Sequence, residues 1–210
     1  MKERGIIFTD EMVRAILDGR KTQTRRLVNS VPTTHDFHGW IMSSACAKDE
    51  GKACWAIGDS PLLKDPIRLN CPVGKVGDRL WVRETFGLRV VRDAAGGTGE
   101  FITYRASKPD AVYCTCASGS VIPMKWKSPA QMPRRSSRIL LEITGVRVER
   151  LQDISQEDAQ AEGFEGYDDD VSGGMSPYSE FSQAWTDIYG KDSWRENAWV
   201  WVIEFKQIQG

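Results

Sequence analysis

One short segment near the N-terminus gathers the side chains best suited to chemistry. It runs from Gly19 to Arg26 and holds four cations together with three hydroxyl or amide side chains. Lys21 and Thr24 stand three residues apart, a spacing that brings side chains together on a turn or helical coil but not on a straight strand. A lysine beside a hydroxyl is a candidate base and nucleophile for acyl transfer. A solvated basic turn without a catalytic role is the alternative.

A carboxylate further along the chain interrupts an apolar strand face. Residues 79–86 alternate as a strand, which places Leu80, Val82, Glu84 and Phe86 on one side. Charged side chains are rare on a buried apolar face, so Glu84 is a candidate lining residue of a binding pocket. A simple ion pair with a neighbouring arginine is an equally good interpretation.

Capped helices and short strands must position these groups. One helix is expected after the cap Thr9-Asp10 and ends at Gly19, and another runs from Ser155 to Gly163 behind a cap-like S-x-x-D pattern. A third begins at Ser176-Pro177. Other strands are expected at 5–8, 101–106, 139–148 and 199–205. Strands and helices do not alternate regularly, which indicates an α+β fold, with a small mixed barrel or rolled sheet carrying helices on its outside.

We expect the third helix to contribute to the hydrophobic core. We expect two long segments of the chain to be insertions. The apolar residues of the third helix recur at helical spacing, namely Tyr178, Phe181, Trp185 and Ile188. Segments 29–76 and 87–137 are interrupted by proline and glycine, so we expect irregular elaborations of a single domain that spans residues 1–210.

The composition excludes several classes of protein. Lys plus Arg is 28 and Asp plus Glu is 29, a net charge of −1, which argues against a protein that coats nucleic acid non-specifically. There is no apolar run near the roughly 20 residues needed to cross a membrane, and no signal peptide follows Met1. We therefore expect a cytoplasmic protein without a membrane partner. No phosphate-binding loop or dinucleotide fingerprint occurs, so no nucleotide or other cofactor is expected.

The cysteines are odd in number and do not form paired zinc motifs. There are five of them, and reduced, scattered thiols are the favoured interpretation for a cytoplasmic chain. A structural zinc held by His35, His38, Cys46 and Cys54 is the alternative. No metal is expected at the candidate site itself.

Four blocks of the sequence resemble the ASCH domain, a member of the PUA-like superfamily. They are residues 16–26, with the pattern G-x-K-T-x-T-x-R, and residues 76–82, 151–163 and 200–206. Their order and character are most similar to small bacterial proteins of this family that hydrolyse N4-acetylcytidine. The longer arrangement, with residues 80–85 and 132–139, resembles ASCH-type proteins carried by phages and prophages. The resemblance implies a small mixed β-barrel with short flanking helices, here with two long insertions.

The resemblance also implies site residues. The amidohydrolases of the family use a Lys, a Thr and a Glu, and the matching positions are Lys21, Thr24 and Glu162. In the implied mechanism Thr24 attacks an N-acyl carbonyl, Lys21 moves protons, and Glu162 positions Lys21 or a water. Lys21 acts either as a general base, which requires a lowered pKa, or as a permanent cation that stabilises an oxyanion. The substrate would be a modified nucleoside.

A binding module is the alternative function. PUA-like domains commonly hold RNA or a modified base, and some ASCH proteins are reported to cut RNA. The cations of residues 20–26 and 134–138 would then bind phosphates while tryptophans stack on a base. The candidate substrate- or RNA-binding residues are Arg20, Arg25, Arg26, Glu84 and Arg138. A third interpretation is a phage-encoded interaction protein in which none of these groups is active. The oligomeric state does not follow from the sequence.

Overall fold

Strands outnumber helices in this protein. The computed structural model describes residues 1–32, 34–43, 47–59, 63–92, 98–116, 118–168 and 173–208. The strands are β1 (Glu3–Ile7), β2 (Gln23–Leu27), β3 (Asp36–Trp40), β4 (Ala53–Ile57), β5 (Lys64–Leu69), β6 (Arg79–Arg83), β7 (Phe86–Arg92), β8 (Thr98–Tyr104), β9 (Val112–Thr115), β10 (Val121–Pro123), β11 (Leu140–Arg150) and β12 (Trp199–Ile208). The α-helices are α1 (Asp10–Leu17), α2 (Gln156–Ala161) and α3 (Pro177–Tyr189). The expected α+β class is confirmed.

The chain divides into two compact units, which we describe separately. The first unit comprises residues 1–20, 79–142 and 207–210. The second comprises residues 21–78 and 143–206. Within the described residues the paired strands do not close into a barrel, so the small barrel stays a prediction.

The first unit contains a parallel pair of strands. β1 runs parallel to β6, and β6 pairs in antiparallel fashion with the first residues of β11. Burial alternates along β6, where Leu80 and Val82 are completely buried, as the period-two pattern predicts. The expected single strand over 79–86 was too long, because β6 ends at Arg83 and β7 begins at Phe86. Thr9 caps α1 as expected, accepting a hydrogen bond from the Met12 amide.

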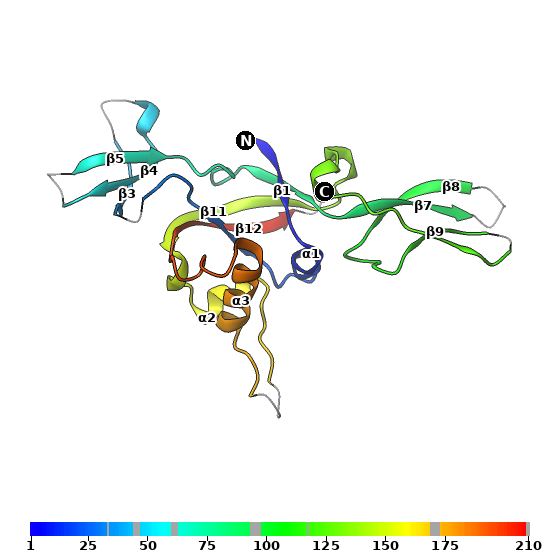
Figure 1. Cartoon of the computed structure of the whole chain (residues 1–210). Coiled ribbons are helices and arrows are strands. Elements are labelled where there is room, and N and C mark those ends of the chain that lie inside the picture. The colour runs from blue at the N-terminus through cyan, green and yellow to red at the C-terminus, as the bar shows by residue number, and fades with distance from the viewer. Residues whose placement is uncertain are drawn as a thin grey trace. The chain divides into compact units, whose positions relative to one another are not determined.

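Two antiparallel ribbons occupy the segment that we expected to be irregular. β7 pairs with β8 from Phe86–Tyr104 to Arg92–Thr98 (Figure 1). β9 pairs with β10. The prediction of an irregular 87–137 segment was wrong for these residues, although the strand expected at 101–106 overlaps β8. These strands were hard to recognise in the sequence because they form two-stranded sheets and are partly exposed. They therefore lack the regular alternation of apolar residues that marks a strand with one buried face.

The second unit is organised around β12. This strand pairs antiparallel with β2, from Val200–Leu27 to Glu204–Gln23, and lies beside β11 on its other edge. The segment Gln23–Leu27 is mostly polar, with Thr24 as its one β-branched residue, and it was predicted as a turn. The apolar partner strand β12 overrides that local preference by supplying a ladder of backbone hydrogen bonds. The segment 23–27 is therefore a strand.

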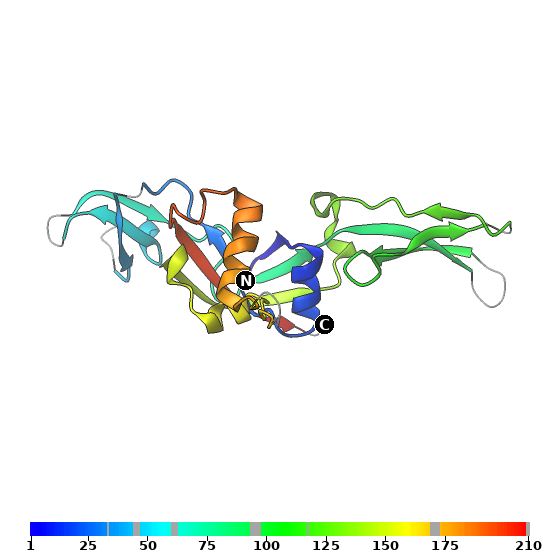
Figure 2. The same ribbon diagram turned by 60° about the horizontal axis from the view of Figure 1, so that its bottom comes forward.

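Helices α2 and α3 pack against β12 through one apolar cluster. Ser155 and Ser176 cap the two helices, as their sequences predict. Figures 1 and 2 show α3 beside the β11–β12 pair. The cluster consists of Leu151, Ile154, Ala159, Phe181, Trp185, Val200 and Val202. The prediction was wrong for Ile188, which is 53% exposed although it shares the helical spacing of Phe181 and Trp185.

A separate three-stranded sheet lies within residues 29–76. Its order is β3-β4-β5, and all its pairs are antiparallel. Trp55 on β4 is completely buried and packs edge-on against Trp201 of β12, with ring centroids 5.6 Å apart. This contact anchors the sheet to the rest of the second unit. The segment is therefore regular where an irregular one was expected.

Candidate functional site

The buried ion pair between Lys21 and Glu162 is the centre of the site. The Lys21 ammonium donates to Glu162 Oε2 at 2.5 Å and to the Glu162 backbone carbonyl at 2.8 Å. The Lys21 side chain is completely buried and that of Glu162 is 3% exposed. Lys21 precedes β2 and Glu162 ends α2, and the Thr22 amide donates to the Ala161 carbonyl at 2.8 Å, which ties the two elements together. Two groups 141 residues apart in the chain thus meet.

Burial sets the proton affinity of Lys21. Removing the ammonium from water lowers its pKa below the ordinary value, and this effect outweighs the Glu162 carboxylate, which raises the pKa. The positive charges of Arg26 and Arg25 lower it further. A lysine with a lowered pKa releases a proton more readily than a surface lysine does.

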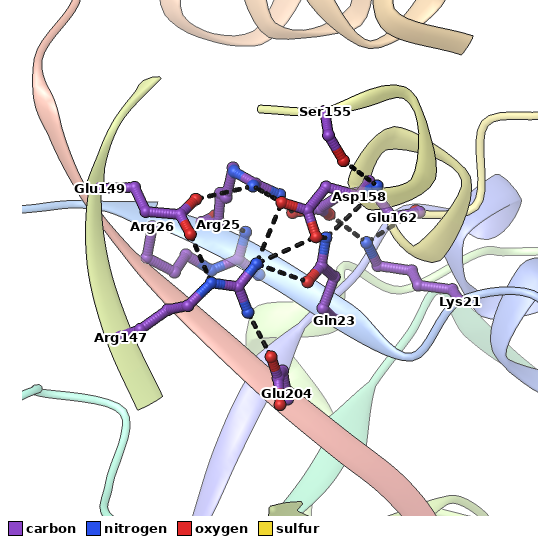
Figure 3. A network of polar contacts seen from close by, with 10 residues as sticks. All are labelled: Lys21, Gln23, Arg25, Arg26, Arg147, Glu149, Ser155, Asp158, Glu162 and Glu204. Atoms are coloured by element: carbon purple, nitrogen blue, oxygen red, sulfur yellow. Dashed lines mark hydrogen bonds and ion pairs between the residues drawn. The ribbon is translucent and has the colours of Figure 1, made fainter. Parts of the chain in front are cut away.

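A second buried cation lies on the same side of β2. Figure 3 shows Arg25 reaching from β2 to the carboxylates of Glu149 and Asp158. Its Nη2 donates to Glu149 Oε2 at 3.0 Å and to Asp158 Oδ2 at 2.9 Å, and its side chain is completely buried. Its Nη1 lies 3.5 Å from Glu162 Oε1. Glu162 therefore stands between two buried cations.

Asp158 joins the other members of the network. It accepts hydrogen bonds from Gln23 at 3.1 Å, from Arg25, and from Arg147 at 2.9 Å (Figure 3). Burial alone raises the pKa of Asp158, but the guanidinium groups of Arg25 and Arg147 and the Gln23 amide outweigh it, so its pKa is lowered. Arg147 also binds Glu149 and Glu204. The network holds α2, β2, β11 and β12 together by charge.

Two polar groups within this network retain unused hydrogen-bonding capacity. Oε1 of Glu162 and the Nε and Nη1 atoms of Arg25 are buried and make no hydrogen bond to the described residues. Buried polar atoms are usually satisfied, so such atoms mark a place for a water or a ligand. The carboxylate oxygen that faces away from Lys21 lies 3.5 Å from Arg25 Nη1 and has the capacity to accept a hydrogen bond from a small polar molecule.

Thr24 lies on the other face of β2. Gln23 and Arg25 both contact Asp158, and β2 keeps a regular register with β12. Because side chains alternate along a strand, Thr24 points away from the face that carries these contacts. Its side chain is 1% exposed, and Ile203 is its partner across the ladder. The predicted turn that would have joined Lys21 to Thr24 is absent from the described chain, which is extended there.

The predicted binding residues are mostly engaged in ion pairs. Arg138 forms a two-pronged pair with Glu84, both bonds measuring 2.9 Å, and its guanidinium lies 4.1 Å from the centre of the Tyr104 ring. Glu84 is completely buried, which agrees with the ion-pair interpretation of this residue. Arg20 contacts Asp18 at 3.1 Å at the surface. Arg26 is half-buried and donates to the Arg25 carbonyl.

Sequence reasoning missed most of the network around the ion pair. Asp158, Glu149, Arg147 and Gln23 were not singled out. A usable signal was present for Asp158, which lies four residues before Glu162 and so shares one face of α2 with it. The alternating charges of Arg147 and Glu149 on β11 were a second signal.

Metal ligands do not converge in the described part of the chain. Among these residues, no group of three or more His, Cys, Asp or Glu side chains is arranged to hold an ion. The His35 ring contacts Thr34 and the Asp65 carbonyl instead. Cys46, one of the thiols considered for a zinc site, lies outside the described residues. Within the same residues, no helix combines the length and apolar character that crossing a bilayer requires.

Comparison with known proteins provides no relative. No protein-family model, no curated protein and no solved structure matches the chain. The ASCH resemblance therefore stays a prediction that rests on the sequence blocks alone.

Proposed function

We propose that the chain is an ASCH-type protein that acts on nucleosides or RNA, and that it removes an N4-acyl group from cytidine by amide hydrolysis. One observation carries this proposal, namely the buried pair of Lys21 and Glu162. The two residues come from separate blocks of the ASCH resemblance, and they are two of the three types that the family's amidohydrolases use. The small mixed barrel of the family belongs to the same proposal.

The geometry favours water, rather than Thr24, as the nucleophile. Thr24 alternates away from the face of β2 that meets α2, so its hydroxyl is poorly placed to pass a proton to Lys21. Oε1 of Glu162 makes no hydrogen bond to the described residues and can hold a water. A carboxylate that activates water is a common general base.

The hydrolysis then proceeds in two steps. The water oxygen bonds to the acyl carbon while Glu162 takes the water proton, and the Lys21 ammonium stabilises the oxyanion that forms. The carbon–nitrogen bond then breaks, and the exocyclic nitrogen takes the proton from Glu162. Cytidine and the free acid are the products. In this arrangement Lys21 keeps its charge throughout, and Arg25 positions Glu162 from the opposite side.

Substrate access requires the site to open. The charged ends of Lys21 and Glu162 are buried, so an acyl group reaches them only when neighbouring groups move apart. Many enzymes close over their substrates in this way.

The direct test is product formation from N4-acetylcytidine. Wild-type protein should release cytidine, and Lys21→Met and Glu162→Gln should each abolish the release. Thr24→Val, which keeps the shape of the side chain, should retain activity if water is the nucleophile. Loss of activity in Thr24→Val with retained folding would reinstate Thr24 as the nucleophile. Absence of cytidine in every sample would rule out this activity.

The complete burial of the ion pair favours one second candidate, a PUA-like RNA-binding module or ribonuclease without amidohydrolase activity. In that function the pair only fixes α2 to β2, and Arg20 and Arg26 are the cations that meet phosphates. Replacing both with alanine should weaken binding of a short RNA, measured by fluorescence anisotropy, and Thr24→Val should not. Unchanged RNA binding in the arginine variant would exclude this role for the two residues.

A further inference from the structure

The first unit contains a cavity that is lined by none of the three candidate catalytic residues, Lys21, Thr24 and Glu162. Its volume is about 500 Å³, within the range of roughly 300–1,000 Å³ that is usual for small-molecule sites. Its apolar walls are Phe86, Leu88, Ile102 and Pro133, and Lys127 and Arg135 bring two cations to the same walls. The cavity lies in the segment that the sequence suggested was an irregular insertion.

Within the described residues, the two cations of this cavity have no carboxylate partner. Lys127 Nζ lies 5.9 Å from the centre of the Phe86 ring, and neither Lys127 nor Arg135 pairs with a carboxylate of the described residues. Neighbouring arginines differ, since Arg134 pairs with Glu3 and Arg138 with Glu84. An apolar cavity that carries two unpaired positive charges is complementary to an anion with an apolar body.

Hydrogen bonds order the backbone segments that carry both cations. Lys127 and Phe86 exchange two backbone hydrogen bonds, of 2.7 and 3.3 Å, which fix Lys127 against β7. Arg135 lies in a short 3-10 turn, residues 134–136, and the Tyr104 hydroxyl donates to the Ser136 carbonyl at 2.9 Å. A site whose backbone is already ordered loses less entropy when a ligand binds.

We propose that this cavity binds a phosphate monoester attached to a ring system, such as a nucleoside monophosphate. A phosphate monoester carries about −1.5 to −2 charges at neutral pH, which matches two cations better than a single carboxylate does. Lysine and arginine are the usual protein partners of phosphate. The apolar walls receive the ring, and Gln131 adds an amide for a hydrogen bond. This inference does not depend on the proposed hydrolysis at Lys21 and Glu162.

The test is calorimetric titration of the full chain with phenyl phosphate as the probe. Phenyl phosphate should bind about tenfold or more tightly than benzoate, which carries one charge, or inorganic phosphate, which lacks the ring. Lys127→Ala combined with Arg135→Ala should weaken the binding of phenyl phosphate by about tenfold or more. Arg134→Ala is the matched control, because this adjacent arginine is paired with Glu3, and it should bind like wild type.

A further variant probes the apolar wall without touching the cations. Ile102 is 39% exposed, so Ile102→Thr should fold normally, and its smaller polar side chain should weaken the binding of phenyl phosphate while leaving that of inorganic phosphate unchanged. Adenosine 5′-monophosphate, and short RNAs with a 5′-phosphate or a 5′-hydroxyl, then identify the source of the ligand. Tighter binding of the nucleotide points to a free metabolite, and tighter binding of the 5′-phosphorylated RNA points to a strand end.

Several results would overturn the proposal. They are absence of phenyl phosphate binding, undiminished binding in the double variant, or equal binding of inorganic phosphate. Tighter binding of hexyl phosphate than of phenyl phosphate would show that the cavity prefers an alkyl chain to a ring, which contradicts the proposed ligand. Each of these leaves the hydrolysis of N4-acetylcytidine unaffected, so the two proposals fail separately.

Discussion

Two regions of the protein differ in whether their cations are buried and paired with carboxylates. In the second unit, Lys21 and Arg25 are completely buried and each meets at least one carboxylate. In the first unit, Lys127 and Arg135 are exposed at the wall of a cavity and have no carboxylate partner among the described residues. Buried charges must be paired because desolvation is expensive, whereas exposed charges need no partner. In the second unit the buried charges therefore satisfy one another around a candidate catalytic pair. In the first unit the exposed cations are available for a ligand.

The largest effect should follow from breaking the buried pair on one side only. Glu162→Leu leaves the Lys21 charge buried without its carboxylate, so the free energy of unfolding should fall by about 3–5 kcal/mol in urea denaturation. Lys21→Met should cost less, because Glu162 keeps Arg25 as a buried cationic partner. The double variant should lose much less than the sum, since it removes both charges together. Additive losses would show that the two groups do not interact.

A smaller loss is expected for Asp158→Asn. The change weakens the hydrogen bonds to Arg25 and Arg147, and the side chain is one-quarter exposed, so we expect a loss of about 1–2 kcal/mol. Because the pKa of Asp158 is lowered in the folded protein, its stabilisation is present above its ordinary pKa of 3.8 and is lost as the pH falls through the folded value. The difference from wild type should therefore vanish in acid. A difference that persists at the lowest pH would contradict a charge-based role.

The pH dependence of Lys21 should run in the opposite sense. Its pKa is lowered by burial, so the unfolded chain binds its proton more tightly than the folded protein does. The cost of burying the ammonium is full below the folded pKa and is relieved as the pH rises toward the unfolded value of 10.5. Relative to Lys21→Met, wild-type protein should thus gain stability between neutral pH and pH 10.5, as thermal melts can show. A difference that does not change with pH would contradict the lowered pKa.

The smallest effect on stability is expected in the first unit. Lys127 and Arg135 make no ion pair with the described residues, so replacing both with alanine should leave the melting temperature unchanged. The same variant should lose ligand binding. A clear drop in melting temperature would show that these cations support the fold, and would remove the contrast between the two regions.

Local patterns predicted the helices well. Thr9, Ser155 and Ser176 cap α1, α2 and α3, and these signals lie within a few residues of the elements they start. The alternation of Leu80 and Val82 in the sequence was an equally clear signal for β6. In the structure both residues are completely buried and their neighbours are partly exposed. Such features depend on neighbours in the sequence, so a single chain is enough to reveal them.

Features that depend on distant partners were harder to predict. β2 was taken for a turn because its polar residues become a strand only beside β12. The meeting of Lys21 with Glu162 came from the family resemblance, since nothing in the spacing of the chain brings them together. Asp158, Arg147 and Lys127 looked like ordinary surface charges, whereas Arg135 lay in a basic segment that was already a candidate for phosphate binding. Only the fold distinguishes charged side chains of a buried network from charged side chains that line a cavity.

The most direct test of the central claim is a time course of N4-acetylcytidine with wild-type protein and Glu162→Gln, followed by mass detection of the products. The Gln side chain keeps the size and one hydrogen-bond acceptor for Lys21, so folding can be verified while the carboxylate is removed. We expect the wild type to release cytidine and acetate in equal amounts and the variant to release neither. Equal rates for the two proteins would show that the buried Lys21–Glu162 pair is a structural tie and not a catalyst.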